Sequence, residues 1–250
     1  RFMFVQRIEG QDLQQLKKGT SDAEKVTVSF YVKGHDSATY VCALYDVDND
    51  RFVGATFPVT TSWARQTITF PADTTGALGD DTTNDLELRF ILHAGSNFTS
   101  GTLATAWESA TAANFAVGIN SIFESTSATF FITGVQMEVG SVATNFEHRS
   151  FGEELFLCSR YCRTYTEQNF GRGKDGDSYF GGGLHFNPPM RATPTLKSGS
   201  SFAVNTGNAG TPSINSGLGP SADSVQILNS DSNWTANVFA RLNATFEAEL

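Results

Sequence analysis

Acidic side chains at alternating positions are the first residues of this sequence whose spacing could support chemistry. Asp46, Asp48 and Asp50 begin like an EF-hand loop, in which carboxylates bind calcium. That loop needs Gly at its sixth position and Glu at its twelfth, and this chain has Arg51 and Phe57 there. We therefore expect a hairpin turn, with a structural calcium ion as the alternative.

Other residues of the types that bind metals are poorly grouped. The acidic loop 80–85 leaves the same two options, a turn or a structural calcium site. Cys158 and Cys162 are one helical turn apart, but no closely spaced His pair accompanies them as a zinc site would require. Three cysteines in 250 residues do not form a disulfide framework, so we expect core packing for Cys42, Cys158 and Cys162. No cofactor is predicted beyond the optional calcium.

Catalytic motifs are absent from the sequence. The nucleophile elbow, the P-loop, the zinc-protease helix and the dinucleotide fingerprint have no match. The four histidines are isolated from one another: His35, His93, His148 and His185. A glycosidase needs two carboxylates about 5–10 Å apart, and the sequence does not single out such a pair. The chain is therefore predicted not to be an enzyme.

Aromatic residues in polar surroundings are the remaining candidates for binding. The polar loop 95–114 contains Trp107 near Asn97 and Glu108, and a sugar can stack on an indole while amides and carboxylates bind its hydroxyls. We predict these three as ligand-binding residues; the alternative is that Trp107 folds back over apolar residues of its own loop. Trp63 begins a strand and is expected in the core. Three strand tyrosines could face outward: Tyr31, Tyr40 and Tyr45.

The composition excludes two classes of partner. Seventeen basic residues against 26 acidic ones give a net charge of −9, so the chain lacks the basic surface that nucleic acids need. No run of 18 apolar residues exists, so no membrane insertion is expected. Hydrophobic residues make up 40% of the chain, enough to form a packed core.

Strands must position these residues, because period-two alternation dominates the chain. Val26, Val28, Phe30 and Val32 alternate with polar residues, which indicates a strand with one buried face. Further strands are expected at about ten-residue spacing over 39–45, 51–59, 63–70, 86–93, 115–119, 128–139, 184–186, 195–204, 224–229 and 234–246. This spacing favours an antiparallel sandwich or barrel over alternating strands and helices.

One helix interrupts the strands. Ser150 and Glu153 form a capping box, and an apolar face of Leu155, Cys158, Tyr161 and Cys162 follows for about three turns. We therefore predict an all-β chain: a jelly-roll sandwich over 1–148, one short helix with a linker over 149–178, and a smaller β-domain over 179–250.

The segment 131–147, Phe-Ile-Thr-Gly-Val-Gln-Met-Glu-Val-Gly-Ser-Val-Ala-Thr-Asn-Phe-Glu, is distinctive. With Arg149 and the residues from Glu154 to Tyr161, it resembles a signature, GVQLEVGSxATxFExRxxxxELxxCxRYY, of bacteriophage tail-fibre and other virion proteins. Residues 186–195 resemble the FPxPMRAxPT segment of the same proteins. Asn145 stands where these proteins usually have Pro, which puts only that local turn in doubt.

The resemblance implies a jelly-roll module similar to carbohydrate-binding modules, a connecting helix and a C-terminal β-domain. It also implies a virion location, contacts with other virion proteins and a homotrimer. Three functions follow as hypotheses: a non-catalytic fibre that attaches to host surface polysaccharide, a purely structural capsid or neck fibre or connector, and, least favoured, a glycan-cleaving tailspike. The resemblance supplies no catalytic residues.

Overall fold

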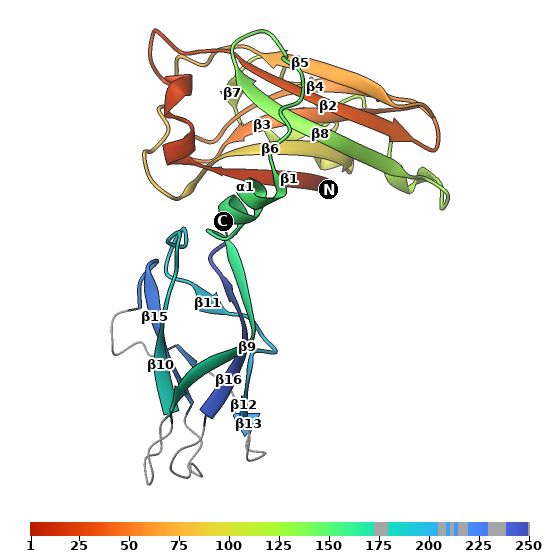
Figure 1. Ribbon diagram of the computed structural model, residues 1–250. Coiled ribbons are helices and arrows are strands. Elements are labelled where there is room, and N and C mark those ends of the chain that lie inside the picture. Colours follow the sequence, from red (N-terminus) through yellow and green to blue (C-terminus); the bar gives the residue numbers. More distant parts are fainter. Residues whose placement is uncertain (173–179, 205–208, 211–212, 215–219, 230–238, 250) are drawn as a thin grey trace. The chain divides into compact units, whose positions relative to one another are not determined.

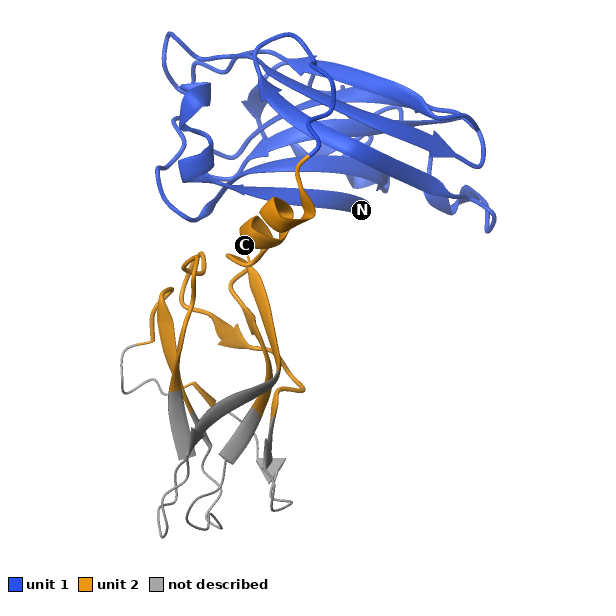
Figure 2. Cartoon of the chain, in the orientation of Figure 1, with its two compact units in different colours: residues 1–148, 250 blue, residues 149–249 orange. Residues whose placement is uncertain are grey.

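The computed structural model describes residues 1–172, 180–204, 209–210, 213–214, 220–229 and 239–249. The chain divides into two compact units, residues 1–148 and residues 149–249, and each is described by itself (Figure 2). Residues 149–178 are predicted to form a helix and a linker, but residues 162–172 of this stretch form a long strand of the second unit. Trp234 lies outside the described residues.

The first unit is an antiparallel two-sheet sandwich (Figure 1). One sheet has the order β1-β6-β3-β4-β7 and the other β5-β2-β8. The chain passes from one sheet to the other at β1–β2, β2–β3, β4–β5, β5–β6 and β7–β8, which is the alternation of a jelly roll. The strands are β1 (Phe2–Glu9), β2 (Val26–Gly34), β3 (Ala38–Asp46), β4 (Arg51–Val59), β5 (Ala64–Phe70), β6 (Asn84–His93), β7 (Glu108–Ser109) and β8 (Phe130–Val139). Short 3-10 helices are η1 (Gly10–Asp12), η2 (Gln14–Leu16), η3 (Ser96–Phe98), η4 (Ala112–Asn114) and η5 (Ile122–Glu124).

Aromatic rings from both sheets form the centre of this sandwich. Phe30 on β2 meets Phe57 on β4 and Phe90 on β6 edge to face, each with ring centroids 5.0 Å apart. A second apolar cluster includes Phe52, whose ring stacks on Phe115 at 4.3 Å. The strand predicted over 115–119 is therefore wrong: Phe115 follows η4 and is buried by tertiary packing, which a local alternation pattern does not report.

A glycine shapes the outer face of the three-stranded sheet. Ser29 pairs with Gln136 but Tyr31 pairs with Thr133, so β8 has a bulge between these positions. Gly134 lies in this bulge with φ +58°, and a Cβ there would approach Tyr31 to 3.2 Å. Glycine is required because this left-handed backbone and this close approach both disfavour a side chain.

The segment after β8 folds back over this outer face. Thr144 donates its N–H and its hydroxyl to Glu138 at 3.1 and 2.5 Å, and Gln136 donates to the Thr144 hydroxyl at 3.0 Å. The Glu147 N–H donates to Gln136 at 2.8 Å, and Arg65 donates to the Thr144 carbonyl. The hydrogen bonds from Thr144 hold the pKa of Glu138 below its usual value. Most of these residues belong to the distinctive segment 131–147, so its polar residues act as scaffold.

The second unit also consists of antiparallel sheets. Strands β11 (Thr195–Leu196), β16 (Phe239–Glu247), β12 (Ser201–Val204) and β13 (Ala209–Gly210) form one sheet, and β9 (Cys162–Arg172) pairs with β16. Strands β10 (Phe180–His185), β15 (Ser224–Asn229) and β14 (Ser213–Ile214) form the other. The buried core includes Phe186 and Phe246, with ring centroids 5.4 Å apart. The chain is thus mostly β, as predicted. None of the helices described is long and apolar enough to cross a membrane.

The helix α1 (Phe151–Cys158) is shorter than predicted. Ser150 and Glu153 form the expected capping box, but Cys162 pairs with Glu247 as the first residue of β9 instead of extending the helix. Strand pairing therefore prevails over the local apolar periodicity. Cys42 is buried as expected, whereas core packing is wrong for Cys158 and Cys162, which are exposed.

A buried ion cluster ties the loops of the first unit together. Lys18, with a side chain only 4% exposed, bonds the carboxylate of Asp46 and lies 3.0 Å from that of Asp73. Its ammonium also donates to the carbonyls of residues 75–76 at 3.0 and 2.8 Å. The Arg51 guanidinium donates two hydrogen bonds, of 2.7 and 3.0 Å, to the Asp73 carboxylate. Burial raises the pKa of Asp73, but the bonds from Arg51 and Lys18 outweigh it and bring the pKa below its usual value.

Replacement of the buried cation tests this cluster. Lys18→Met leaves two buried carboxylates without one of their cations, and we expect the first unit to lose about 3–5 kcal/mol of unfolding free energy. Urea denaturation of the full chain measures the loss. Lys25→Met, at an exposed position, is the control and should stay within about 0.5 kcal/mol of the parent chain. A loss below about 1 kcal/mol for Lys18→Met would contradict the assigned role.

Candidate functional site

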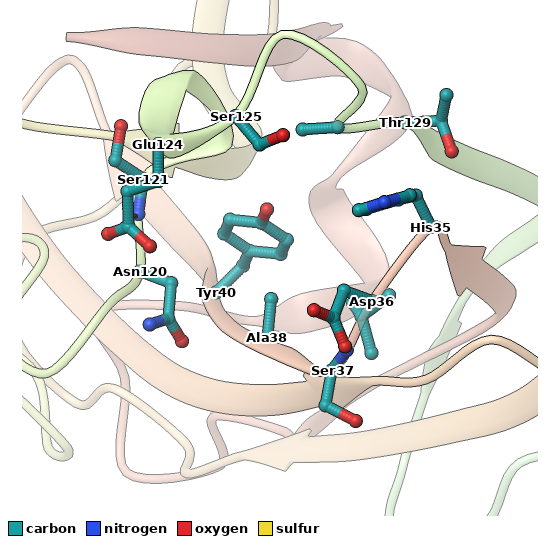
Figure 3. Close-up of a pocket in the computed structure, with 12 residues that line it drawn as sticks. His35, Asp36, Ser37, Ala38, Tyr40, Asn120, Ser121, Glu124, Ser125 and Thr129 are labelled. Carbon is teal, nitrogen blue, oxygen red and sulfur yellow. Dashed lines mark hydrogen bonds between the residues drawn. The ribbon is translucent and has the colours of Figure 1, made fainter.

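The first unit contains a polar pocket (Figure 3). Its volume is about 110 Å³, room for several water molecules and therefore for a small polar ligand. The turn 35–37 between β2 and β3, the start of β3 and the segment 120–129 around η5 form its walls. The lining residues are His35, Asp36, Ser37, Ala38, Tyr40, Val59, Asn120, Ser121, Glu124, Ser125, Ala128 and Thr129.

Tyr40 stands among these residues and joins the pocket to the core (Figure 3). Its ring packs edge to face on Phe130 at 5.6 Å and against Phe57 at 6.2 Å, and the residue is only 5% exposed. Burial, and then the nearby charge of Glu124, raise the pKa of Tyr40, so its hydroxyl stays protonated. Among the described residues this hydroxyl has no hydrogen-bond partner, so it is a fixed donor available to a ligand.

Local hydrogen bonds hold the wall of the pocket in place. Asn120 accepts the Thr39 N–H at 2.8 Å with its side chain and donates its own N–H to the Thr39 carbonyl at 2.9 Å. Ser121 and Glu124 form a capping box at η5. Because a loop anchored at both the strand and the cap loses little freedom on binding, the site is preorganised.

The charge of the pocket limits what it can bind. Asp36 and Glu124 supply two carboxylates, and His35 is the one titratable nitrogen base in the lining. The remaining polar groups are hydroxyls and an amide, which accept and donate hydrogen bonds to sugar hydroxyls. This arrangement suits a neutral, hydroxyl-rich ligand and repels an anionic one.

A serine–histidine contact beside the pocket has a structural role. Ser121 Oγ lies 2.8 Å from His93 Nδ1, but the same oxygen accepts the Phe123 N–H at 3.1 Å as the cap of η5. Within the described residues, no carboxylate hydrogen-bonds the other nitrogen of His93 to orient it. The pair therefore lacks the third member of a catalytic triad.

Each of the three predicted ligand residues has different surroundings in the structure. The Trp107 N–H donates to the Pro71 carbonyl at 2.9 Å, its ring packs against the core, and the Lys18 ammonium lies 5.1 Å from the ring centroid. Glu108 accepts from an amide, that of Asn114, at 2.7 Å. Asn97 is exposed on η3. Trp107 thus covers the buried ion cluster, and its sugar-binding role stays a prediction.

The first acidic stretch is a hairpin turn and does not fit a calcium loop. Asp46 is bound by Lys18, and Asp50 accepts the Tyr45 hydroxyl at 2.7 Å, so the alternating carboxylates of this turn do not converge. The turn predicted between the two strands is confirmed, because β3 and β4 pair from Asp46 to Arg51.

The second acidic loop contains a buried carboxylate. Asp85 is fully buried; its Oδ1 accepts the Thr83 hydroxyl at 2.8 Å, and its Oδ2 has no hydrogen-bond partner among the residues that the structure describes. Burial, with the charges of Asp48 and Asp81, raises its pKa. A Cβ on Gly10 would lie 2.1 Å from Oδ2, so only glycine fits there. Nowhere in the described residues do three or more His, Cys, Asp or Glu side chains form a group that could hold a metal, and structural calcium stays a prediction.

Sequence reasoning missed the pocket and misplaced two aromatic residues. Tyr31 faces outward as expected, whereas the ring of Tyr40 lies in the core. Trp63 was expected in the core, yet it is 49% exposed because it precedes β5 at the edge of the sheet. The polar turn His35-Asp36-Ser37 before an aromatic strand is the one local signal that could have indicated the pocket.

Comparisons with known proteins identify no family. No family model and no curated protein matches the chain. A solved structure, that of the PBSX exported protein XepA, is 8% identical and aligns over 98% of this chain and 81% of its own. The TM-score is 0.23, and at this value the likeness carries no argument about fold or function.

Removal of the indole distinguishes a structural role of Trp107 from a ligand-binding role. Trp107→Ala deletes the hydrogen bond to Pro71 and uncovers the ion cluster, so we expect a loss of about 2 kcal/mol in the unfolding free energy of the first unit. Thermal denaturation followed by circular dichroism measures it. An unchanged melting temperature together with lost saccharide binding would instead establish Trp107 as a ligand residue.

Proposed function

We propose that the chain is a non-catalytic fibre protein of a bacteriophage virion whose first unit binds a neutral saccharide of the host surface. The observation that carries the saccharide class is the pocket around Tyr40, with a tyrosine hydroxyl that has no hydrogen-bond partner among the described residues and a ring of hydroxyl, amide and carboxylate groups. The virion location rests on the resemblance of residues 131–161 to virion fibre proteins.

The polar groups of the pocket support binding more than turnover. Asp36 accepts the Ser37 N–H at 2.7 Å, and Glu124 accepts the Ser121 N–H at 3.0 Å, so both carboxylates have structural hydrogen bonds. An activated nucleophile is missing from the lining, and the Ser121 hydroxyl is engaged as a cap. Hydrogen bonding and one aromatic edge are what the site offers a ligand.

A second role, structural assembly, is favoured by α1. Four large apolar side chains on this helix are exposed: Phe151 by 82%, Leu155 by 57%, Phe156 by 55% and Leu157 by 43%. Exposed apolar groups of this size usually mark an interaction surface. A parallel homotrimer in which copies of this helix meet would bury them, and it agrees with the fibre family. Contacts with other virion proteins would extend from such a trimer.

The tyrosine hydroxyl provides the test of the pocket. Tyr40→Phe keeps the ring contacts and removes only the donor, so we expect a nearly unchanged melting temperature and roughly tenfold weaker binding of neutral saccharides. A glycan array of bacterial surface saccharides selects the ligand, and calorimetry measures the affinity. Tyr165→Phe, in the second unit, is the matched control. Equal affinity of Tyr40→Phe and the parent chain would refute the site.

Assembly is tested by the mass of the particle in solution. We expect light scattering to give three times the 27.0 kDa of one chain, and the double variant Phe151→Ser, Phe156→Ser to give a single chain with both units folded. A parent chain that remains monomeric at micromolar concentration would contradict the homotrimer.

A further inference from the structure

Large aromatic side chains gather on the outer face of the sheet β5-β2-β8. Trp63 is 49% exposed, Phe131 47% and Tyr31 40%. Lys33 pairs directly with Phe131, and Ala64, the residue after Trp63, pairs with Val32. Trp63, just before β5, therefore continues the row that Lys33 on β2 and Phe131 on β8 form across the sheet, and Tyr31 lies two residues along β2 on the same face. We call these four residues the aromatic platform.

The platform is the uncovered end of this face. Thr27 and Ser29, on the same side of β2, are 0% and 1% exposed, and Thr27 donates its hydroxyl to the Gly140 carbonyl at 2.8 Å. The chain segment after β8 thus covers one half of the face. The other half, where Lys33 lies, holds aromatic side chains that a soluble surface rarely exposes together.

A cation without a counter-ion lies in the middle of the platform. The Lys33 ammonium is 5.4 Å from the centroid of the Trp63 ring and 5.2 Å from that of Phe131. In the part of the chain that the structure describes, no carboxylate forms an ion pair with Lys33. The two rings stabilise the ammonium and fix its position, but they leave its hydrogen-bond donors free for an anion.

We propose that the aromatic platform binds an acidic saccharide, a sugar that carries a carboxylate. The C–H face of such a sugar stacks on Trp63 or Phe131, and its carboxylate pairs with Lys33 in a charge-assisted hydrogen bond. A second copy of the chain fits less well, because two platforms placed face to face would bury two unpaired ammonium groups. The platform shares no residue with the pocket around Tyr40, and the negative lining of that pocket disfavours the same ligand.

A matched pair of probes tests the proposal on the full chain. Tetragalacturonate and its carboxyl-reduced counterpart differ only in the carboxylates, and calorimetry gives the affinity of each. We expect the chain to prefer the acidic form by roughly tenfold at low salt, with the preference falling as salt is added. Lys33→Gln should abolish the preference, and Trp63→Ala should weaken both probes about tenfold.

Two control variants show whether binding belongs to the platform. Phe123→Ala removes a side chain that is 63% exposed outside the platform and should leave both affinities unchanged. Tyr40→Phe should leave the affinity for the acidic probe unchanged, because the negative lining of the pocket disfavours that ligand, so failure of the pocket and failure of the platform are distinguishable. Should Trp63→Ala lower the melting temperature strongly, Lys33→Gln still provides the test.

Three results would overturn the proposal. One is equal affinity for the acidic and reduced probes, or no binding of either at millimolar concentration. Another is unchanged preference in Lys33→Gln. The third is a parent chain that self-associates through this face, shown by Trp63→Ala alone converting the assembly to single chains in light scattering.

Discussion

The buried Lys18 ammonium is the constraint on which the loops of the first unit depend. It joins the chain before β2, the end of β3 and the loop after β5, because its partners Asp46 and Asp73 and the carbonyls of residues 75–76 come from those segments. Two carboxylates and two cations balance once Arg51 is included, and a buried cluster is stable only when every charge is paired. The ring of Trp107 then excludes water from one side, which explains why that indole lies inward.

Local patterns account for many of the strands, although not for β1 and β9, and they do not account for the position of the aromatic residues. Alternation along β2 predicted which side chains enter the core, and Phe30 and Val32 are indeed fully buried. Trp63 and Trp107 both border polar segments, and no local signal distinguishes them. The difference is tertiary: the lysine beneath Trp107 lies against buried carboxylates distant in sequence, whereas Lys33 lies beside the rings of Trp63 and Phe131 and forms no ion pair with a described residue. Long-range pairing of charges cannot be derived from one segment, which is why the core position expected for Trp63 was wrong and the packing of Trp107 over the ion cluster was not foreseen.

The distinctive segment 131–147 identifies a scaffold and says little about binding. Gln136 and Glu138 hold the returning chain through Thr144, and Gly134 provides the left-handed residue of a bulge. A conformation fixed by several short side-chain bonds tolerates few substitutions, so a recognisable pattern is expected there whatever the ligand. The pocket, in contrast, draws on the turn 35–37 and the segment 120–129, where surface loops can change without disturbing the sheets.

The two proposed sites of the first unit differ in charge, and this difference matters for a chain of net charge −9. An acidic polysaccharide is repelled by such a protein at long range, but at physiological ionic strength the repulsion is screened beyond about 8 Å. A contact with Lys33 is shorter than this distance, so one ammonium held between two rings can select a carboxylate locally. The pocket around Tyr40 has Asp36 and Glu124 at equally short range, and therefore selects against the same group. A host surface that alternates neutral and acidic sugars would engage both sites. The pocket around Tyr40 would bind the neutral sugars, and the platform with Lys33 would bind the acidic ones.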